Sequence, residues 1–294
     1  LVACGEKPEA MLNSARDYLA KNDAKAAIIQ VKNALQANPE LPEARLLLGK
    51  ALLDTGDAVG AETELRKALA LKASQDQVLP ILARAMLAQG HSKKVVDEFG
   101  KTTLAQGPAN ADLQTTLATA FATEGQFERS NTALAAALSA DPTYDPALLM
   151  QVRQQATRQD VDGAMAGVDA IIAKSPKNFE AWKLKGDLTL HLKKQPDEAL
   201  AFFRKSVEVR PDFIAGHAAA LRMLFGQNKL EEVDKQLAGL KAVAPNHPQT
   251  KFFEAQLAFQ RKDFKLARSL SQQVLKSAPN NALGLQLAGA TELA

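Results

Sequence analysis

The sequence predicts an all-α protein, a right-handed superhelical solenoid of about eight helix–turn–helix repeats. Three observations predict it. Prolines recur about every 34 residues, small residues recur in phase with them, and a turn residue lies between the small residues of each unit. Because proline cannot continue a helix, each recurring proline marks the end of one unit. The recurring prolines are Pro39, Pro142, Pro176, Pro211, Pro245 and Pro279.

Small residues share three positions of the repeat, where they let two helices approach closely. The first position holds Ala15, Gly49, Ala83, Ala118, Gly186 and Gly289. The second holds Ala27, Ala61, Ala164, Ala199 and Ala267, and the third holds Ala34, Ala68 and Ala137. The turn position between the first two holds Asn22, Gly56, Gly90 and Gly125. Asparagine and glycine tolerate the left-handed conformation that ends a helix, so each unit is predicted to be a helical hairpin.

Large apolar residues recur in the same phase on both predicted helices. On the first helix they are Tyr18, Leu52, Met86, Phe121 and Leu224. On the second helix they are Val31, Leu65, Phe99, Leu134, Val168, Phe203 and Leu237. One hairpin cannot bury this apolar face alone, whereas stacked hairpins bury each other's and form a continuous core.

A 34-residue helix–turn–helix unit that ends in proline is the signature of the tetratricopeptide repeat. We place eight units at 8–41, 42–75, 76–110, 111–144, 145–178, 179–213, 214–247 and 248–281. Residues 1–7 precede them, and 282–294 are predicted to form the first helix of a ninth repeat. That helix carries Leu283, Leu285, Leu287 and Leu293 and no polar cap follows it. Because solenoid ends need polar caps, we expect further chain or a binding partner there.

Three units depart from the pattern, and we expect local shifts of the hairpin angle in them. The third has Val95 and Thr102 at positions of small residues. The fifth has Gln155 at the aromatic position and Gln159 at the turn. The sixth has one extra residue near 193–196.

Composition and motifs give no support for an enzyme. The histidines His91, His191, His217 and His247 lie in four different units, and no two have the spacing of metal ligands. Serines lack a nucleophile-elbow motif, and no glycine-rich phosphate loop is present. The net charge of +3 and the absence of a basic block with interleaved aromatics argue against nucleic acid. We therefore predict a binding protein with no catalytic residue, metal or cofactor.

The N-terminus resembles the end of a bacterial lipoprotein signal. Leu1-Val2-Ala3-Cys4-Gly5 reads as a lipobox, and Cys4 is the only cysteine of the chain. A lipid on this thiol would anchor the protein to a membrane surface without a spanning helix. Gly5 rather than aspartate after the cysteine suggests the outer membrane, by analogy with bacterial lipoproteins. The alternative is an exposed thiol of no particular role.

Four stretches resemble a particular family more closely than the generic repeat does. They are AAIIQVKNALQ at 26–36, EARLLLGK at 43–50, AETELRKAL at 61–69 and DQVLPILARA at 76–85. With the lipobox, they resemble the PEP-CTERM system TPR-repeat lipoprotein family over roughly residues 1–100. The resemblance implies a longer protein of Gram-negative bacteria that carry an exosortase sorting system and exopolysaccharide genes. The implied role is an envelope scaffold linked to exopolysaccharide export or protein sorting, without catalytic residues.

The first helices of such repeats line the concave face, where a ligand would bind. One position reads Arg16, Lys50, Arg84, Arg153 and Arg222 in five of the eight repeats. One helical turn later lies a mostly apolar row that includes Leu19, Leu53, Leu87, Phe225 and Phe259. We interpret the two rows as a groove for an extended anionic peptide, a C-terminal segment or an acidic polymer. The competing interpretation is a solvated helix face in which each basic side chain pairs with a nearby carboxylate.

We therefore predict a non-enzymatic protein–protein interaction scaffold, lipid-anchored in the outer membrane and facing the periplasm. Its partners would be proteins or peptides, with no nucleic acid, and membrane contact would run only through the lipid. The alternative is a periplasmic repeat protein that binds polysaccharide directly. Sugar grooves have aromatic platforms, and the scattered positions of Trp182, Tyr18 and Tyr144 disfavour it.

Overall fold

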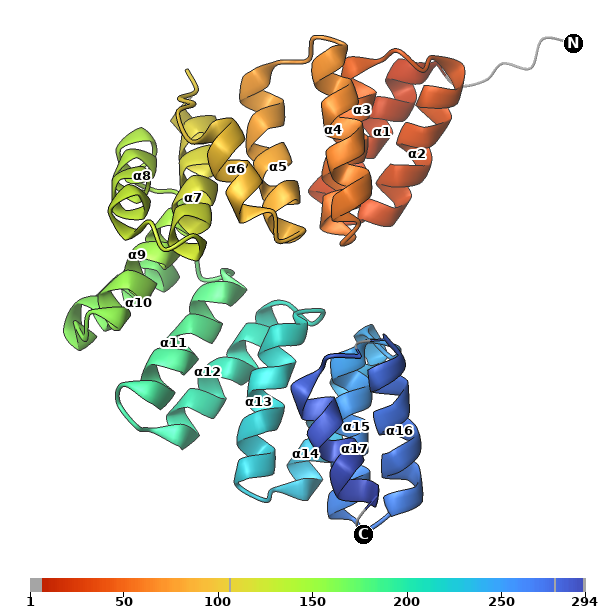
Figure 1. Cartoon of the computed structure of the whole chain (residues 1–294), viewed down its shortest axis with the longest axis vertical. Helices are drawn as coiled ribbons and strands as arrows, with labels where there is room; N and C mark the ends of the chain where they lie inside the picture. The colour runs from red at the N-terminus through yellow and green to blue at the C-terminus, as the bar shows by residue number, and fades with distance from the viewer. Residues whose placement is uncertain (1–6, 106, 278, 293–294) are drawn as a thin grey trace, which may run out of the picture. The chain divides into compact units, whose positions relative to one another are not determined.

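The computed structural model describes residues 7–105, 107–277 and 279–292, which form seventeen α-helices and no strand. The predicted all-α repeat fold is thereby confirmed. Consecutive helices are joined by short turns and lie side by side in antiparallel pairs within each part of the chain (Figure 1). The chain divides into two compact units, Leu1–Gln151 and Val152–Ala294, which we describe separately.

The N-terminal unit contains four helical hairpins and the start of α9. Its helices are α1 (Pro8–Ala20), α2 (Ala24–Ala37), α3 (Pro42–Asp54), α4 (Ala58–Ala70), α5 (Gln75–Ala88), α6 (Ser92–Phe99), α7 (Gly107–Thr123), α8 (Phe127–Ala140) and α9 (Asp145–Thr157). Two clusters of buried apolar residues form its core. One joins α1, α2 and α3, and the other runs from α4 to the start of α9.

The C-terminal unit begins within α9 and continues the same pattern. Its further helices are α10 (Val161–Lys174), α11 (Phe179–His191), α12 (Pro196–Val209), α13 (Ile214–Gly226), α14 (Leu230–Val243), α15 (Pro248–Gln260), α16 (Phe264–Ser277) and α17 (Ala282–Glu292). A buried cluster centred on α12, α13 and α14 forms much of its core and includes Phe203 and Phe253. Helix α17 packs on α15 and α16.

Local chemistry explains where the helices begin and end. The carboxylates of Asp23, Asp57 and Asp160 accept the backbone N–H three residues later and so cap the second helices α2, α4 and α10. The predicted turn residues Asn22, Gly56, Gly90 and Gly125 all have positive φ. Gln159 also has a φ of 63°, so the fifth unit keeps the turn geometry at the cost of backbone strain.

The third hairpin differs most from the expected spacing. Helix α6 ends at Phe99, where Gly100, Thr102 and Thr103 follow and disfavour a helix. Helix α7 already begins at Gly107, ahead of the unit boundary expected at 111. The segment between them is held by side chains of α7. Asn110 Oδ1 accepts the Leu104 N–H at 3.1 Å, and Gln114 donates to the Thr102 carbonyl.

Candidate functional site

The basic row predicted from the sequence is exposed at all five positions. In the N-terminal unit, Arg16, Lys50 and Arg84 project from the first helices α1, α3 and α5. Arg153 and Arg222 lie on α9 and α13, within the C-terminal unit. The N-terminal unit therefore presents three of these cations on first helices that follow one another in the repeat.

Two of the three cations are already paired with a carboxylate on the next first helix. Arg16 Nε lies 2.9 Å from Glu43 Oε1, and the same oxygen also accepts from Nη2. Arg84 Nε lies 3.5 Å from Asp112 Oδ1. Both arginine side chains remain more than two-fifths exposed. At these two positions the structure favours the competing interpretation, in which the cations belong to intramolecular pairs.

Lys50 differs because its corresponding position on the next first helix is neutral. Gln77 stands in the same place relative to Lys50 as Glu43 does relative to Arg16, 27 residues further along the chain. Both Lys50 and Gln77 are exposed. Across the described ranges, Lys50 forms no ion pair. Within the described part of the N-terminal unit, Lys50 therefore lies without an ion pair between the ion-paired Arg16 and Arg84.

Asp112, the partner of Arg84, also interacts with Tyr144. Burial raises the pKa of the Tyr144 hydroxyl, and the negative charge of Asp112 raises it further. Asp112 therefore interacts both with Arg84 on α5 and with the tyrosine that precedes α9. Of the cations on α1, α3 and α5, Lys50 is the one without an ion pair to another described residue.

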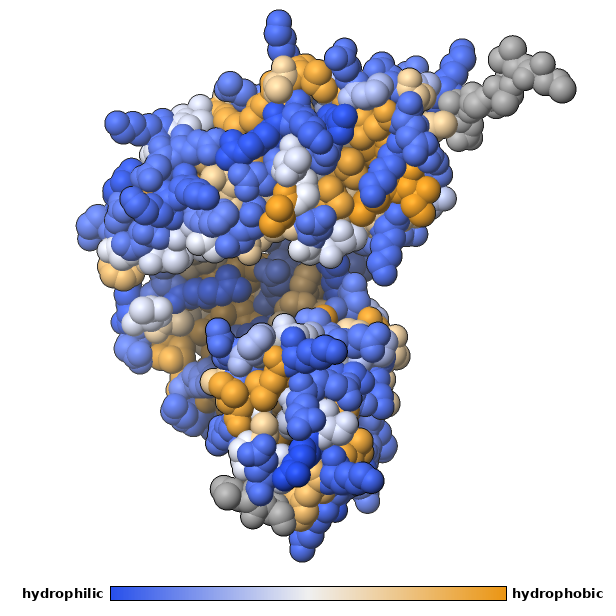
Figure 2. Space-filling model, turned by 45° about the vertical axis from the view of Figure 1, so that its right-hand side comes forward, coloured by the Kyte–Doolittle hydropathy of each residue, from blue (hydrophilic) through white to orange (hydrophobic). Residues whose placement is uncertain are grey.

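The apolar row beside these cations is half-buried in the N-terminal unit. Leu19, Leu53 and Leu87 each pack on a core cluster while part of the side chain stays accessible. Figure 2 shows apolar surface on this unit lying between hydrophilic side chains. The three leucines can therefore contact apolar side chains of a bound segment.

In the C-terminal unit the two predicted residues of the apolar row pack against other aromatic rings. Phe225 is 6% exposed and stacks on Phe253, with ring centroids 6.0 Å apart. Phe259 packs edge-on against Phe264. The predicted apolar groove residues of this unit, Phe225 and Phe259, thus have aromatic partners, and the candidate surface is taken to lie across α1, α3 and α5.

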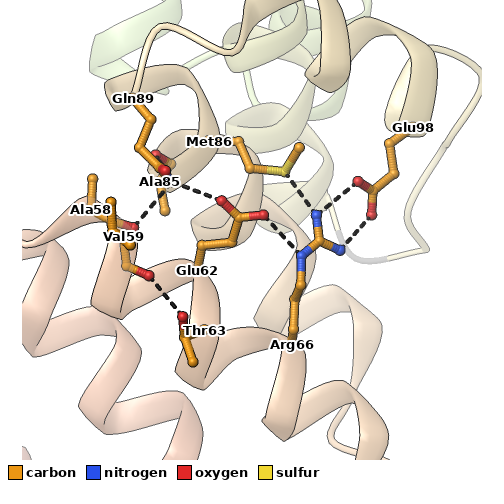
Figure 3. A network of polar contacts seen from close by, with 9 residues as sticks. All are labelled: Ala58, Val59, Glu62, Thr63, Arg66, Ala85, Met86, Gln89 and Glu98. Atoms are coloured by element: carbon orange, nitrogen blue, oxygen red, sulfur yellow. Dashed lines mark hydrogen bonds and ion pairs between the residues drawn. The ribbon is translucent and has the colours of Figure 1, made fainter.

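A polar network on the second helices has no counterpart in the sequence prediction (Figure 3). Arg66 of α4 donates from Nη1 and Nη2 to Glu98 of α6, both at 3.0 Å, and from Nε to Glu62 at 2.9 Å. Gln89, which directly follows α5, donates to Glu62 at 2.8 Å. Burial alone would raise the pKa of Glu62, but hydrogen bonds from Gln89 and Arg66 lower it. The network ties two hairpins together, and only the four-residue spacing of Glu62 and Arg66 signals it in the sequence.

Polar residues outside these networks have structural roles. The buried His217 contacts the Pro211 carbonyl through Nε2 at 2.9 Å and Gln236 through Nδ1 at 2.8 Å. Trp182 stacks on Phe202 and donates its indole N–H to the Pro176 carbonyl.

Among the described residues, no group of three His, Cys, Asp or Glu side chains could hold a metal ion. In the same part of the chain, no helix is long and apolar enough to cross a membrane. Cys4, Leu293 and the side chain of Leu283 lie outside the described residues.

Comparisons with known proteins identify the repeat. A family model described as tetratricopeptide repeat matches residues 12–76, and a second model of that description matches residues 179–213. No curated protein matches the chain.

Several solved structures share the fold at low sequence identity. Human IFIT1, in a dimer with PPP-AAAA, is 16% identical with a TM-score of 0.64, over 96% of this chain and 72% of its own. The Cut9–Hcn1 hetero-tetramer of the APC/C is 13% identical with a TM-score of 0.59, over 96% and 55%. A tetratricopeptide repeat protein from Parabacteroides merdae is 15% identical with a TM-score of 0.50, over 98% and 100%. At these identities the likeness concerns the fold alone.

Proposed function

Because this chain is built of tetratricopeptide repeats, which generally mediate binding of proteins or peptides, we propose that it is a non-enzymatic interaction scaffold. Its N-terminal unit binds an extended peptide across α1, α3 and α5. The observation that supports this site is the exposed Lys50, whose equivalent position on the next first helix is the neutral Gln77, whereas Arg16 and Arg84 pair with carboxylates. A carboxylate of the ligand would take the place that Glu43 and Asp112 hold beside the arginines.

The ligand that fits is a segment with a carboxylate next to apolar side chains. The ammonium group of Lys50 offers three hydrogen-bond donors to an acidic side chain or a C-terminal carboxylate. Leu53 lies one helical turn further along α3, and Leu87 is its equivalent on α5. Affinity should fall with ionic strength, because the attraction acts between exposed charges.

Charge reversal at Lys50 tests this site with little risk to folding. Lys50→Glu should weaken binding of a labelled peptide of alternating leucine and glutamate about tenfold, since reversal removes an attraction and adds a repulsion of similar size. Fluorescence anisotropy at low salt gives the dissociation constant. Lys32→Glu, an exposed lysine on the second helix α2, is the matched control. Equal affinities for the two variants, or equal affinity for a peptide with glutamine in place of glutamate, would contradict the proposal.

We also propose that the scaffold is a lipoprotein of the outer membrane, facing the periplasm, anchored through Cys4. The lipobox-like residues 1–5 and the family resemblance of residues 1–100 support this proposal. On the same basis, its partners belong to exopolysaccharide export or PEP-CTERM/exosortase protein sorting. Expression behind a bacterial lipoprotein signal, with an alkyne fatty acid in the medium, should label the protein and not Cys4→Ala. Labelling of both proteins, or of neither, would end the anchoring proposal.

A photo-crosslinking amino acid at position 53 would identify the partner in cells. If the groove is used, crosslinks should form from Leu53 on α3 and be reduced by Lys50→Glu. A crosslinker at position 32, on the second helix α2, controls for nonspecific capture. Crosslinks that are unaffected by Lys50→Glu would place the partner elsewhere on the protein.

A further inference from the structure

A cavity of about 580 Å³ lies between α14, α15 and α16 of the C-terminal unit. Two second helices, α14 and α16, form its sides, and the first helix α15 lies between them in sequence. Its apolar lining consists of Leu237, Ala238, Leu257, Ala258, Leu266 and Leu270. Leu266 is 47% exposed, so part of this apolar wall is open to solvent.

The equivalent space in the N-terminal unit is filled by an arginine. Arg66 is the ninth residue of α4, and its guanidinium group bridges to Glu98 of α6 (Figure 3). The same group lies against Met86 of α5, with Nη2 3.5 Å from the sulfur. Arg204, the ninth residue of α12, likewise bridges to Glu232 of the next second helix, α14. A long cationic side chain at this position therefore spans the gap between consecutive second helices.

Small and apolar residues replace this bridge around the cavity. Ala238 is the ninth residue of α14, and Leu270 is the seventh residue of α16, which is the place of Glu98 in α6. Ala258 of α15 lies four residues before a turn residue of positive φ, which is the place of Met86 in α5. The cavity thus arises because two long side chains are replaced by methyl groups.

The charged residues at the rim of the cavity are already engaged with one another. Arg261 forms an ion pair with Asp234, and Lys241 Nζ lies 2.7 Å from Glu254 Oε1. The remaining carboxylate, Asp263, caps α16 by accepting a backbone N–H at 3.1 Å. The residues that α14 contributes to the two ion pairs are separated by about 10 Å along the helix. An apolar space of limited length therefore lies between two neutralised pairs of charges.

We propose that this cavity binds an uncharged, predominantly apolar small molecule, which lies against Leu266 and Leu270. Its volume falls within the range of about 300–1,000 Å³ that small-molecule sites have. A single side chain of a partner protein would leave much of this volume empty. A helix or an extended chain laid along α14 would meet the ion pairs at both ends. The cavity uses none of the residues of the peptide site on α1, α3 and α5, so the two sites can be tested independently.

Two fluorescent probes with the same aromatic rings test the chemical class of the ligand. N-phenyl-1-naphthylamine is neutral and brightens in apolar sites, and it should bind the full chain saturably with one molecule per chain. 8-Anilinonaphthalene-1-sulfonate adds a single negative charge and should bind at least about tenfold more weakly, because the cations of the rim already have partners. Equal or tighter binding of the sulfonate would overturn the proposal.

Filling the cavity tests where the neutral probe binds. Ala238→Arg combined with Leu270→Glu reproduces the bridge between α4 and α6, and Ala258→Met reproduces the methionine of α5. Each change should raise the dissociation constant of the neutral probe at least about tenfold, since the new side chains occupy the space of the probe. Ala242→Arg, at an exposed position of α14 outside the cavity lining, is the matched control and should leave it unchanged.

Circular dichroism and thermal unfolding of each variant check that the helices remain folded. If the charged double substitution unfolds the chain, Ala258→Met decides the question, because it changes only the apolar volume. A neutral probe that fails to bind saturably would overturn the proposal. Affinity that survives filling of the cavity, or that Ala242→Arg lowers as much as the filling variants do, would overturn it as well.

Discussion

Half-buried carboxylates that join two helices are the residue-scale feature with the clearest energetic consequence. Glu64 of α4 accepts from Arg45 of α3 at 2.6 Å and from Lys67 at 2.8 Å. The Arg45 and Glu64 side chains are 18% and 13% exposed. Burial alone would raise the pKa of Glu64, but the hydrogen bonds from Lys67 and Arg45 outweigh it and lower the pKa. The ionised form is therefore the one that stabilises the fold.

Glu64→Gln should destabilise the protein at neutral pH and less so in acid. A carboxyl group with a lowered folded-state pKa stabilises above its unfolded pKa of about 4.3, and this stabilisation is lost as pH falls through the folded pKa. We expect a loss of about 1–2 kcal/mol in the free energy of unfolding at pH 7, because Arg45 keeps its buried charge without its partner. Urea titrations from pH 7 to pH 3.5 measure it, with the exposed Glu40→Gln as control. A difference that does not change with pH would contradict this assignment.

At the scale of the helical hairpin, the separation of the two helices depends on which side chain faces the small residue. Gly186 of α11 faces the ring of Phe203, which is 1% exposed, whereas Gly226 at the end of α13 faces open space. Alanine fits at the equivalent positions Ala15 and Ala83. A glycine is required only where a large side chain of the second helix reaches the first.

Alanine should therefore have opposite effects at the two glycines. In Gly186→Ala the new methyl group overlaps the Phe203 ring, which costs about 1–3 kcal/mol and exceeds the gain in helix propensity. In Gly226→Ala only that gain remains, at most about 1 kcal/mol. Urea midpoints followed by circular dichroism should fall for the first variant and stay equal or rise for the second. A rise for Gly186→Ala would mean that Phe203 moves without cost.

Features that repeat were predictable from the sequence, and features that belong to one hairpin were not. Proline, small residues and turn residues recur because every hairpin must end, pack closely and reverse direction. The short α6 depends on contacts such as Asn110 with Leu104, which occur once and so have no period. Likewise, the basic row on the first helices could be predicted because its residues recur once per repeat. Only the structure shows that Arg16 and Arg84 are paired and Lys50 is not.

For the molecule as a whole, the cores of the two units suggest how stability is distributed. The buried clusters containing Leu65 and Phe203 are formed by residues of different units. In repeat proteins each unit is stabilised mainly by its neighbours in sequence, so damage should spread only over nearby hairpins. Leu65 and Phe203 occupy the same repeat position, and each packs against a glycine of its own first helix.

Leu65→Ala and Phe203→Ala should therefore unfold different parts of the chain. Each removes about 2–5 kcal/mol of core packing. Hydrogen exchange followed by mass spectrometry resolves the effect along the chain. Phe203→Ala should speed exchange in α11 to α14 and leave α1 to α4 near their original rates. Leu65→Ala should speed exchange in α1 to α4 and leave α13 to α16 near their original rates. If either substitution accelerated exchange equally throughout, the hairpins would unfold as one cooperative body and neighbour-limited stability would be wrong for this chain.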